Sequence, residues 1–270
     1  MARRRIMNIL LKEWHLLFTD VNTALLVTVL PLVIVGQGIL YVWLAERFGG
    51  EAMLASSVFQ TALSKLEGEM PALATFTGDE RLVVLLLSQF NFFLLLIPTM
   101  IAINVAAFSI VDEKMSGSLE ALLATPVRTW ELLLGKTLAG AIPALIVAWV
   151  SAGIFLTVVN GLGWGEQSAM VTNAKWFLML FVLTPAVAIL SFMLGVIGSS
   201  RARDSKSAQN LAVIIVLPVL ALIAVQVTGI VWFTPLLTLA LALVVGLADA
   251  FALRIAVKLF QRESIVTRWR

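Results

Sequence analysis

Few residues in this 270-residue chain have side chains that do chemistry, and the first candidates are Gly135–Lys136–Thr137. This order ends the phosphate-binding loop of many nucleotide hydrolases, in which backbone amides surround the phosphates and the lysine contacts them. That loop needs a second glycine five residues before Gly135, and Trp130 occupies the position. Residues 130–134 also read as helix rather than as a Gly-rich loop. We therefore interpret Lys136 as a residue at the start of a membrane helix, with its ammonium group snorkelling at the interface.

Other catalytic and metal-binding residues are equally scarce. The chain has no cysteine, which excludes disulfides, zinc–thiolate sites and thiol nucleophiles. It has one histidine, His15, so neither a histidine-based metal or haem site nor a serine–histidine protease is expected within one chain. Asp249 is the only acid well inside an apolar run, and Arg254 follows five residues later. We favour a local ion pair for these two over a functional buried acid, and we predict no metal site and no cofactor.

The most informative segment is a polar stretch between two long apolar runs, residues 111–126. Asp112, Glu113 and Lys114 would end one membrane helix at the water, and Gly117 would let the backbone reverse. Ser118 would then cap a short helix that carries a stripe of leucines, and Thr125–Pro126 would end it and start the next helix. Two interpretations stay open. The short helix either packs on its own bundle or presents leucines and acids to a partner.

Composition identifies the environment in which these residues sit. Hydrophobic residues make up 60% of the chain, charged residues 13%, and the mean hydropathy is +1.00, whereas a soluble domain carries about 25% charge. Backbone polar groups must be paired inside lipid, so membrane spans are helices or closed barrels. The apolar runs are continuous rather than alternating, which excludes the barrel. We predict an all-α membrane protein that forms a single domain over residues 1–270.

Six spans of about 20 apolar residues are predicted. They cover residues 21–44, 82–111, 137–159, 176–198, 211–229 and 235–257. Pro98 is expected to kink the second span, and a very short turn near Trp232–Thr234 joins the last two. Residues 1–20 are predicted to form an amphipathic helix in the membrane interface, with Trp14 at headgroup depth. Residues 45–80 form a second amphipathic, extracytoplasmic segment whose helical pattern breaks at Gly68 and Pro71, and residues 112–136 form the cytoplasmic region.

The distribution of basic residues predicts the orientation. Fifteen Lys and Arg residues fall on the side of the two termini and the polar segment, and four fall on the other side. The four are Arg47, Lys65, Arg81 and Lys175. Cytoplasmic loops carry the excess of Lys and Arg, so both termini should be cytoplasmic in a multi-pass protein of the cell inner membrane. The net charge of +3 is explained by this topology, and no nucleic-acid partner is predicted.

Neutral polar residues occur within the spans, but acids do not cluster there. The candidates for a polar path are Gln37, Asn91, Asn104 and Gln226. Each of them is also suited to join helices by hydrogen bonds. A carrier driven by protons or sodium ions normally shows several buried acids. Their scarcity indicates that energy for any transport enters from elsewhere.

The polar segment resembles the membrane subunits of ABC type-2 transporters, a mostly exporting class. The resemblance lies in a Glu-x-x-x-Gly-Ser/Thr-x-Glu-x-Leu-Leu-x-Thr-Pro stretch, a following Glu and a Gly-Lys. The matching residues are Glu113, Gly117, Ser118, Glu120, Leu122, Leu123, Thr125, Pro126, Glu131, Gly135 and Lys136. The tail 259–263, the six-span order and the interfacial helix are similar to the family as well. One departure is the short connection between the fifth and sixth spans, where relatives often carry re-entrant helices.

The resemblance implies an ABC exporter permease without catalysis of its own. Two ATP-binding cassette ATPase subunits would dock on its cytoplasmic face, and a second copy or a sister permease would complete the path through the lipid. The coupling residues would be Glu113, Lys114, Gly117, Ser118, Leu119, Glu120, Leu122, Leu123, Thr125 and Pro126. The alternatives are a stand-alone channel or secondary carrier, and a membrane-embedded lipid enzyme, for which no cluster of His, Asp or Glu is found. The sequence does not identify the substrate.

Overall fold

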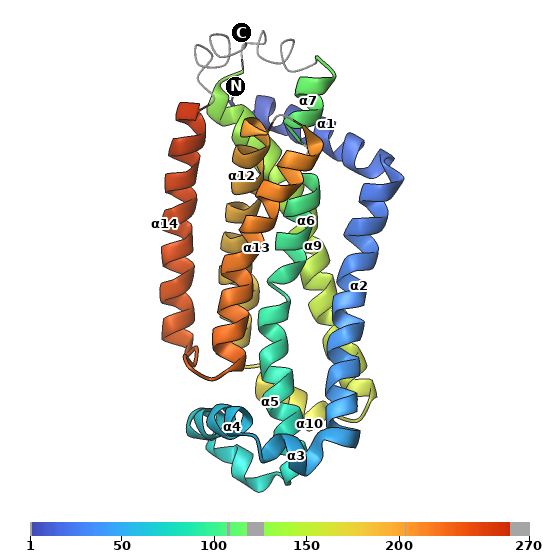
Figure 1. Ribbon diagram of the computed structural model, residues 1–270, viewed down its shortest axis with the longest axis vertical. Coiled ribbons are helices and arrows are strands. Elements are labelled where there is room, and N and C mark those ends of the chain that lie inside the picture. The colour runs from blue at the N-terminus through green and yellow to red at the C-terminus, as the bar shows by residue number, and fades with distance from the viewer. Residues whose placement is uncertain (1, 107–108, 118–126, 203, 260–270) are drawn as a thin grey trace.

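The computed structural model describes residues 2–106, 109–117, 127–202 and 204–259, and within these ranges the regular structure is entirely helical. Long helices lie side by side in one bundle (Figure 1). The first helix α1 (Ala2–Thr19) and the last residues of α14 (Pro235–Leu259) lie at the same end, which we call the terminal end. Short helices cover the opposite, distal end. The predicted all-α class is confirmed, while the Ser118–Pro126 part of the polar segment lies outside the described residues.

Five described helices are long and apolar enough to cross a membrane. They comprise Thr23–Gly49, Gly78–Ala102, Thr129–Gly161, Ala174–Arg201 and Pro235–Lys258. They correspond to the predicted first, second, third, fourth and sixth spans. The predicted fifth span falls on α13 (Ser205–Val227), of which Val213–Val227 is a shorter apolar helix. Residues 228–234 connect α13 to α14, a longer link than the predicted turn at Trp232–Thr234.

The first span agrees closely with the prediction. α2 (Val21–Leu44) begins after Asp20, whose carboxylate accepts a hydrogen bond from the backbone N–H of Thr23 at 2.9 Å. This side-chain cap satisfies one of the free amides at a helix start. α1 ends at Thr19, so the chain turns from α1 into α2 at Asp20. The predicted interfacial helix and first span are therefore two separate helices.

The second span is interrupted as predicted but ends earlier. α5 (Gly78–Phe93) gives way to α6 (Leu96–Val105) one turn before Pro98, because a proline ring clashes with the carbonyl four residues earlier, that of Leu94. The predicted continuation to Val111 is wrong, since α6 ends at Val105 and α7 (Val111–Met115) is separate. The hydroxyl of Ser199 accepts the backbone N–H groups of Ile110 and Val111, each at 3.1 Å. A distant side chain thus takes up amides that a continuous helix would pair internally.

The third and fourth spans pack against each other. α9 (Thr129–Gly161) begins before the predicted start of the third span and leaves Val127 and Arg128 outside the helix. Pro126, which was predicted to start this helix, lies outside the described residues. The fourth span is a continuous run of α11 (Ala174–Leu178), a π-helical turn η3 (Met179–Leu183) and α12 (Thr184–Arg201). α12 packs against α6, α9, α13 and α14. Small residues allow this packing, and a Cβ at Gly140 would lie 2.1 Å from the Phe192 ring.

The distal end is covered by short helical segments, of which the first continues directly from α2. They comprise η1 (Ala45–Gly49), α3 (Gly50–Leu54), α4 (Ser57–Glu69), η2 (Pro71–Thr75) and α10 (Gly165–Val171). We call η1, α3, α4 and η2 the distal cap. α4 ends next to Gly68, as the pattern predicted, and buries Ala62 and Leu66. Arg81 closes the following turn by donating to the carbonyls of Phe76 and Ala74, each at 2.9 Å.

Candidate functional site

A buried group of charges lies at the terminal end, where α1, α7 and α9 meet. The Nζ of Lys136 lies 3.0 Å from Oε1 of Glu13 and 3.0 Å from Oε1 of Glu113. It also donates to the backbone carbonyl and hydroxyl of Ser109 at 3.2 and 3.1 Å. The side chain of Lys136 is 1% exposed. The prediction that Lys136 snorkels to the interface is therefore wrong, because two carboxylates from other helices neutralise it in place.

Helix α1 supplies a second lysine to the same cluster. The Nζ of Lys12 lies 3.2 Å from Oε1 of Glu113, with 49% of its side chain exposed. Two lysines and two glutamates from three helices thus balance in charge, and we call Lys12, Glu13, Glu113 and Lys136 the terminal charge cluster. The carboxylate of Glu13 is directed toward Lys136 in the interior. The cluster therefore connects Glu113, at the start of the predicted coupling region, to α1 and to α9.

Further contacts hold α1 against α9. The Trp14 indole N–H donates to the carbonyl of Ala139 at 2.8 Å, and Arg5 lies 3.4 Å from Glu131. Ile9 packs against Gly135, where a Cβ would lie 2.9 Å from a methyl carbon of Ile9. The glycine before Lys136 therefore allows close approach of the two helices rather than phosphate binding. The interfacial helix is tied to the bundle by polar and apolar contacts together.

Asp112 lies beside the terminal charge cluster on α7. Its burial raises its pKa above the ordinary value, and the positive charge of Lys136 acts in the opposite direction. Asp112 also borders a cavity of about 490 Å³ with Glu13, Asp20 and Asn104. Asp112 is therefore only partly desolvated, whereas its neighbour Glu113 is paired with two lysines.

The structure covers only the beginning of the predicted coupling site. Glu113 and Lys114 lie on α7, and Gly117 follows with a φ of 70°, a left-handed conformation that favours glycine. The predicted backbone reversal stays a prediction, because the residues that follow Gly117 lie outside the described part of the chain. The remaining predicted residues lie outside the described part of the chain. They are Ser118, Leu119, Glu120, Leu122, Leu123, Thr125 and Pro126.

The four predicted polar residues of the path lie in different places. Gln37 borders a cavity near the distal end, and Asn104 borders the one at the terminal end while donating to the carbonyl of Met100. Gln226 is buried and accepts the backbone N–H of Phe233 at 3.3 Å, so it holds the link between α13 and α14. Asn91 is buried with neither side-chain atom hydrogen-bonded. The structure therefore does not bring the four together into one site.

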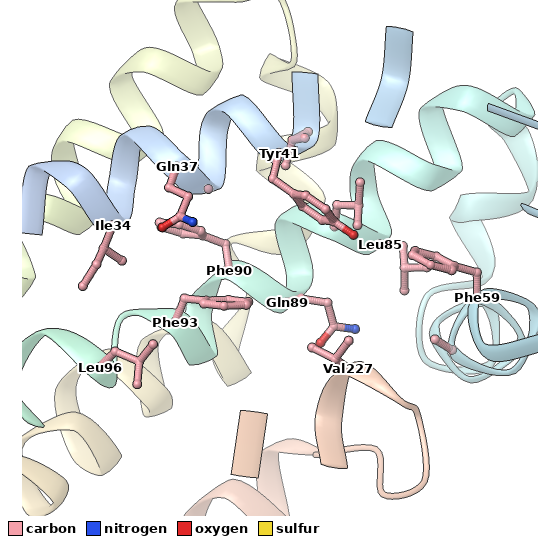
Figure 2. A pocket seen from close by; sticks show the side chains of 14 residues that line it. Ile34, Gln37, Tyr41, Phe59, Leu85, Gln89, Phe90, Phe93, Leu96 and Val227 are labelled. Atoms are coloured by element: carbon pink, nitrogen blue, oxygen red, sulfur yellow. The ribbon is translucent and has the colours of Figure 1, made fainter. Parts of the chain in front are cut away.

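The distal cavity has a volume of about 320 Å³ and lies between α2, α4 and α5. Figure 2 shows aromatic rings of Tyr41, Phe59, Phe90 and Phe93 around it, with the amides of Gln37 and Gln89. Gln89 belongs to this site, but our sequence analysis did not select it. Its position inside the apolar run 82–111 was the signal that could have identified it, the same signal that singled out Asn91 and Asn104.

Two other charged positions differ in their pairing. Within the described residues no ion pair joins Asp249 to Arg254, and Oδ1 of Asp249 has no hydrogen-bond partner, so the predicted local pair does not form. Lys175, counted only as an outer charge, lies 3.1 Å from Glu69 of the distal cap. Its Nζ also lies 4.9 Å from the centre of the Trp232 ring. This long-range pair had no local sequence signal.

The comparisons with known proteins agree with this architecture. The sequence matches the ABC-2 family transporter protein family over residues 7–261, and the chain belongs to that family. It is therefore a membrane protein of the ABC-2 transporter family. Permeases of this family generally pair with ATPase subunits.

Individual relatives match over a short region only. A stretch of 63 residues is 38% identical to the probable multidrug ABC transporter permease YbhR of Escherichia coli K12, and to the protein of the same name in Escherichia coli O157:H7. The stretch represents 23% of this chain and 16% of each relative. No solved structure matches the chain.

Proposed function

We propose that this chain is the permease of an ABC exporter, driven by two separate ATPase subunits that dock at residues 112–136. The observation that carries the proposal is the terminal charge cluster within a chain of the ABC-2 family. Glu113 stands at the start of the docking region and is paired with the interfacial helix through Lys12 and with the third span through Lys136. A force applied to α7 reaches both elements through these contacts.

The proposed topology has six spans, with α13 as the fifth. Both termini and residues 112–136 face the cytoplasm, and the distal cap faces the opposite side of the inner membrane. The distribution of basic residues supports this orientation. A second permease, identical or a sister subunit, completes the path.

The coupling segment is proposed to include Glu113, Lys114, Gly117, Ser118, Leu119, Glu120, Leu122, Leu123, Thr125 and Pro126. Its leucines would occupy an apolar groove of the ATPase subunit and its acids would pair with the rim of that groove. A helix in a groove is a common mode of recognition between proteins. The proposed segment has this composition: a leucine stripe with glutamate beside it.

The test uses the permease co-expressed with its ATPase subunits and reconstituted in nanodiscs. Glu120→Arg and Leu123→Arg should abolish co-purification of the ATPases and the permease-dependent change in ATP hydrolysis. Glu166→Arg, an exposed glutamate on α10 at the distal end, is the matched control and should change neither quantity. Unaltered co-purification and hydrolysis in both coupling variants would refute the docking assignment. Substrate flux through the permease without ATPase subunits would refute the transporter class.

A further inference from the structure

None of the described residues that line the distal cavity carries a charge. Its polar groups are two amides and one phenol, from Gln37, Gln89 and Tyr41, and its remaining lining is apolar apart from Gly38. The volume of about 320 Å³ lies at the lower end of the usual range for small-molecule sites, about 300–1,000 Å³. Such a lining is suited to an apolar body with one or two neutral polar groups.

Gln89 is the residue that indicates a ligand. It is 6% exposed, and neither its amide nitrogen nor its amide oxygen has a hydrogen-bond partner. Figure 2 shows this amide directed toward the space beside Val227. A buried amide without partners is costly in an apolar environment, and a bound molecule with a donor and an acceptor would relieve that cost. Gln226 differs in that its amide oxygen accepts a backbone N–H, and its amide nitrogen alone has no partner.

The aromatic wall of the cavity is fixed by its own packing. Phe90 stacks on Phe155 with ring centres 3.8 Å apart and lies 6.5 Å from Phe93. Gly38 allows this position, because a Cβ there would lie 2.1 Å from the Phe90 ring. Tyr41 and Phe93 are partly exposed, so the cavity opens between α2 and α5 at the side of the bundle. A molecule dissolved in the bilayer can enter from that side.

We propose that the distal cavity binds an uncharged amphiphile, whose apolar body packs on Phe59, Phe90 and Phe93 and whose hydroxyl, ester or amide group pairs with Gln89. A cationic or anionic head group would find no opposite charge in the lining and would lose its hydration without compensation. This assignment rests on the proposed function, because it names the substrate class for the exporter. Its test measures binding alone.

The chain offers a clean probe of binding. Tyr41 is its single tyrosine and borders the cavity, so protein labelled with 3-fluorotyrosine carries one 19F resonance. The permease in nanodiscs is titrated with monolaurin, laurate or dodecyltrimethylammonium, which share a chain length and carry a neutral, an anionic or a cationic head. The three probes are compared at equal mole fractions in the bilayer. Monolaurin should shift the resonance saturably, and the two charged probes should bind about tenfold more weakly or not at all.

The variants test the role of Gln89. Gln89→Leu removes the unpaired amide, so the protein should fold at least as well while monolaurin binding weakens about tenfold. Gln60→Leu, the same change at an exposed site on α4 outside the cavity, should bind like the native protein. Equal affinity for neutral and charged probes, undiminished binding by Gln89→Leu, or no saturable shift would each overturn the assignment. Saturable binding without ATP-dependent transport would refute the proposed function and leave this site standing.

Discussion

Among the residues whose burial the structure describes, each end of the bundle buries one lysine, and the two are held by different partners. At the terminal end Lys136 contacts two glutamates and Ser109, and the exposed Lys12 shares one of those glutamates. At the distal end Lys175 has one glutamate, Glu69, and the face of Trp232, whose indole N–H donates to the same carboxylate at 2.6 Å. Both groups are neutral overall, but the terminal one joins more elements.

The comparison shows how segments outside the membrane are attached to a bundle of apolar helices. Lipid is as apolar as the helix surfaces, so hydrophobic burial does little to hold membrane helices together, and polar contacts contribute specificity. α1 and α7 are fixed to α9 by the terminal charge cluster, and the distal cap is fixed by Glu69 to α11 and to the link between α13 and α14. The terminal group spans three helices and adjoins the proposed docking segment, so a disturbance there should spread further.

The largest effect is expected for Lys136→Met. Removing one partner of a buried ion pair typically costs about 3–5 kcal/mol, because the other charge stays buried, and Lys136 leaves two glutamates behind. Unfolding of the permease in detergent, followed by denaturant titration, measures the loss. Lys12→Met removes an exposed partner of the same cluster and should cost less than about 1 kcal/mol. Equal losses in the free energy of unfolding for the two variants would show that the burial of Lys136 adds nothing to its contribution to stability.

A smaller effect is expected for Lys175→Met, about 2–3 kcal/mol, because Glu69 keeps the Trp232 hydrogen bond and is itself partly exposed. The loss should be local, and limited proteolysis should cut residues 45–77 faster. Adding Glu69→Gln removes the unpaired charge and should restore part of the stability. If the loss in the double variant equalled the sum of the losses for Lys175→Met and Glu69→Gln alone, the two residues would have no interaction energy.

Most of the bundle could be predicted from the sequence because lipid imposes a local rule. A span needs about 20 apolar residues wherever it lies in the chain, so residues 21–44 coincide with α2, and Pro98 marks the break between α5 and α6. The end of α6 could not be predicted, since Ser199 and Lys136 take up backbone groups near residues 109–111 from distant parts of the sequence.

The sites were less predictable than the helices. The pairs Glu13–Lys136 and Glu69–Lys175 are each separated by more than a hundred residues, and composition carries no information on such pairing. A cavity depends on side-chain shapes contributed by several helices, so Gln37 was selected as a polar residue and Gln89 was not, although both border the same space.

Two tryptophans extend the comparison to single hydrogen bonds. Trp14 donates to a neutral carbonyl at the terminal end, and Trp232 donates to the Glu69 carboxylate at the distal end. Hydrogen bonds to charged groups contribute about 1.5–3 kcal/mol and neutral ones about 1 kcal/mol. Trp232→Phe should therefore lower the free energy of unfolding by about 2 kcal/mol and Trp14→Phe by about 1 kcal/mol, measured under identical conditions. The reverse order would mean that ring packing, rather than the charge of the acceptor, determines the two contributions.

The smallest effect is expected for Asp112→Asn, next to the paired Glu113. Burial raises the pKa of Asp112 above its ordinary value of 3.8, so between that value and the higher pKa in the folded protein the folded state binds more protons than the unfolded state. Ionisation of Asp112 therefore lowers stability as pH rises through this window, opposite to a carboxylate whose pKa is lowered by an ion pair. Asp112→Asn should change stability at neutral pH by less than about 0.5 kcal/mol, because the residue is exposed and only partly desolvated. It should also reduce the decline of stability with rising pH above pH 4, measured by denaturant titration across pH 4–7. A steeper decline in the variant would mean that Asp112 stabilises the terminal charge cluster through Lys136 more than its burial opposes it.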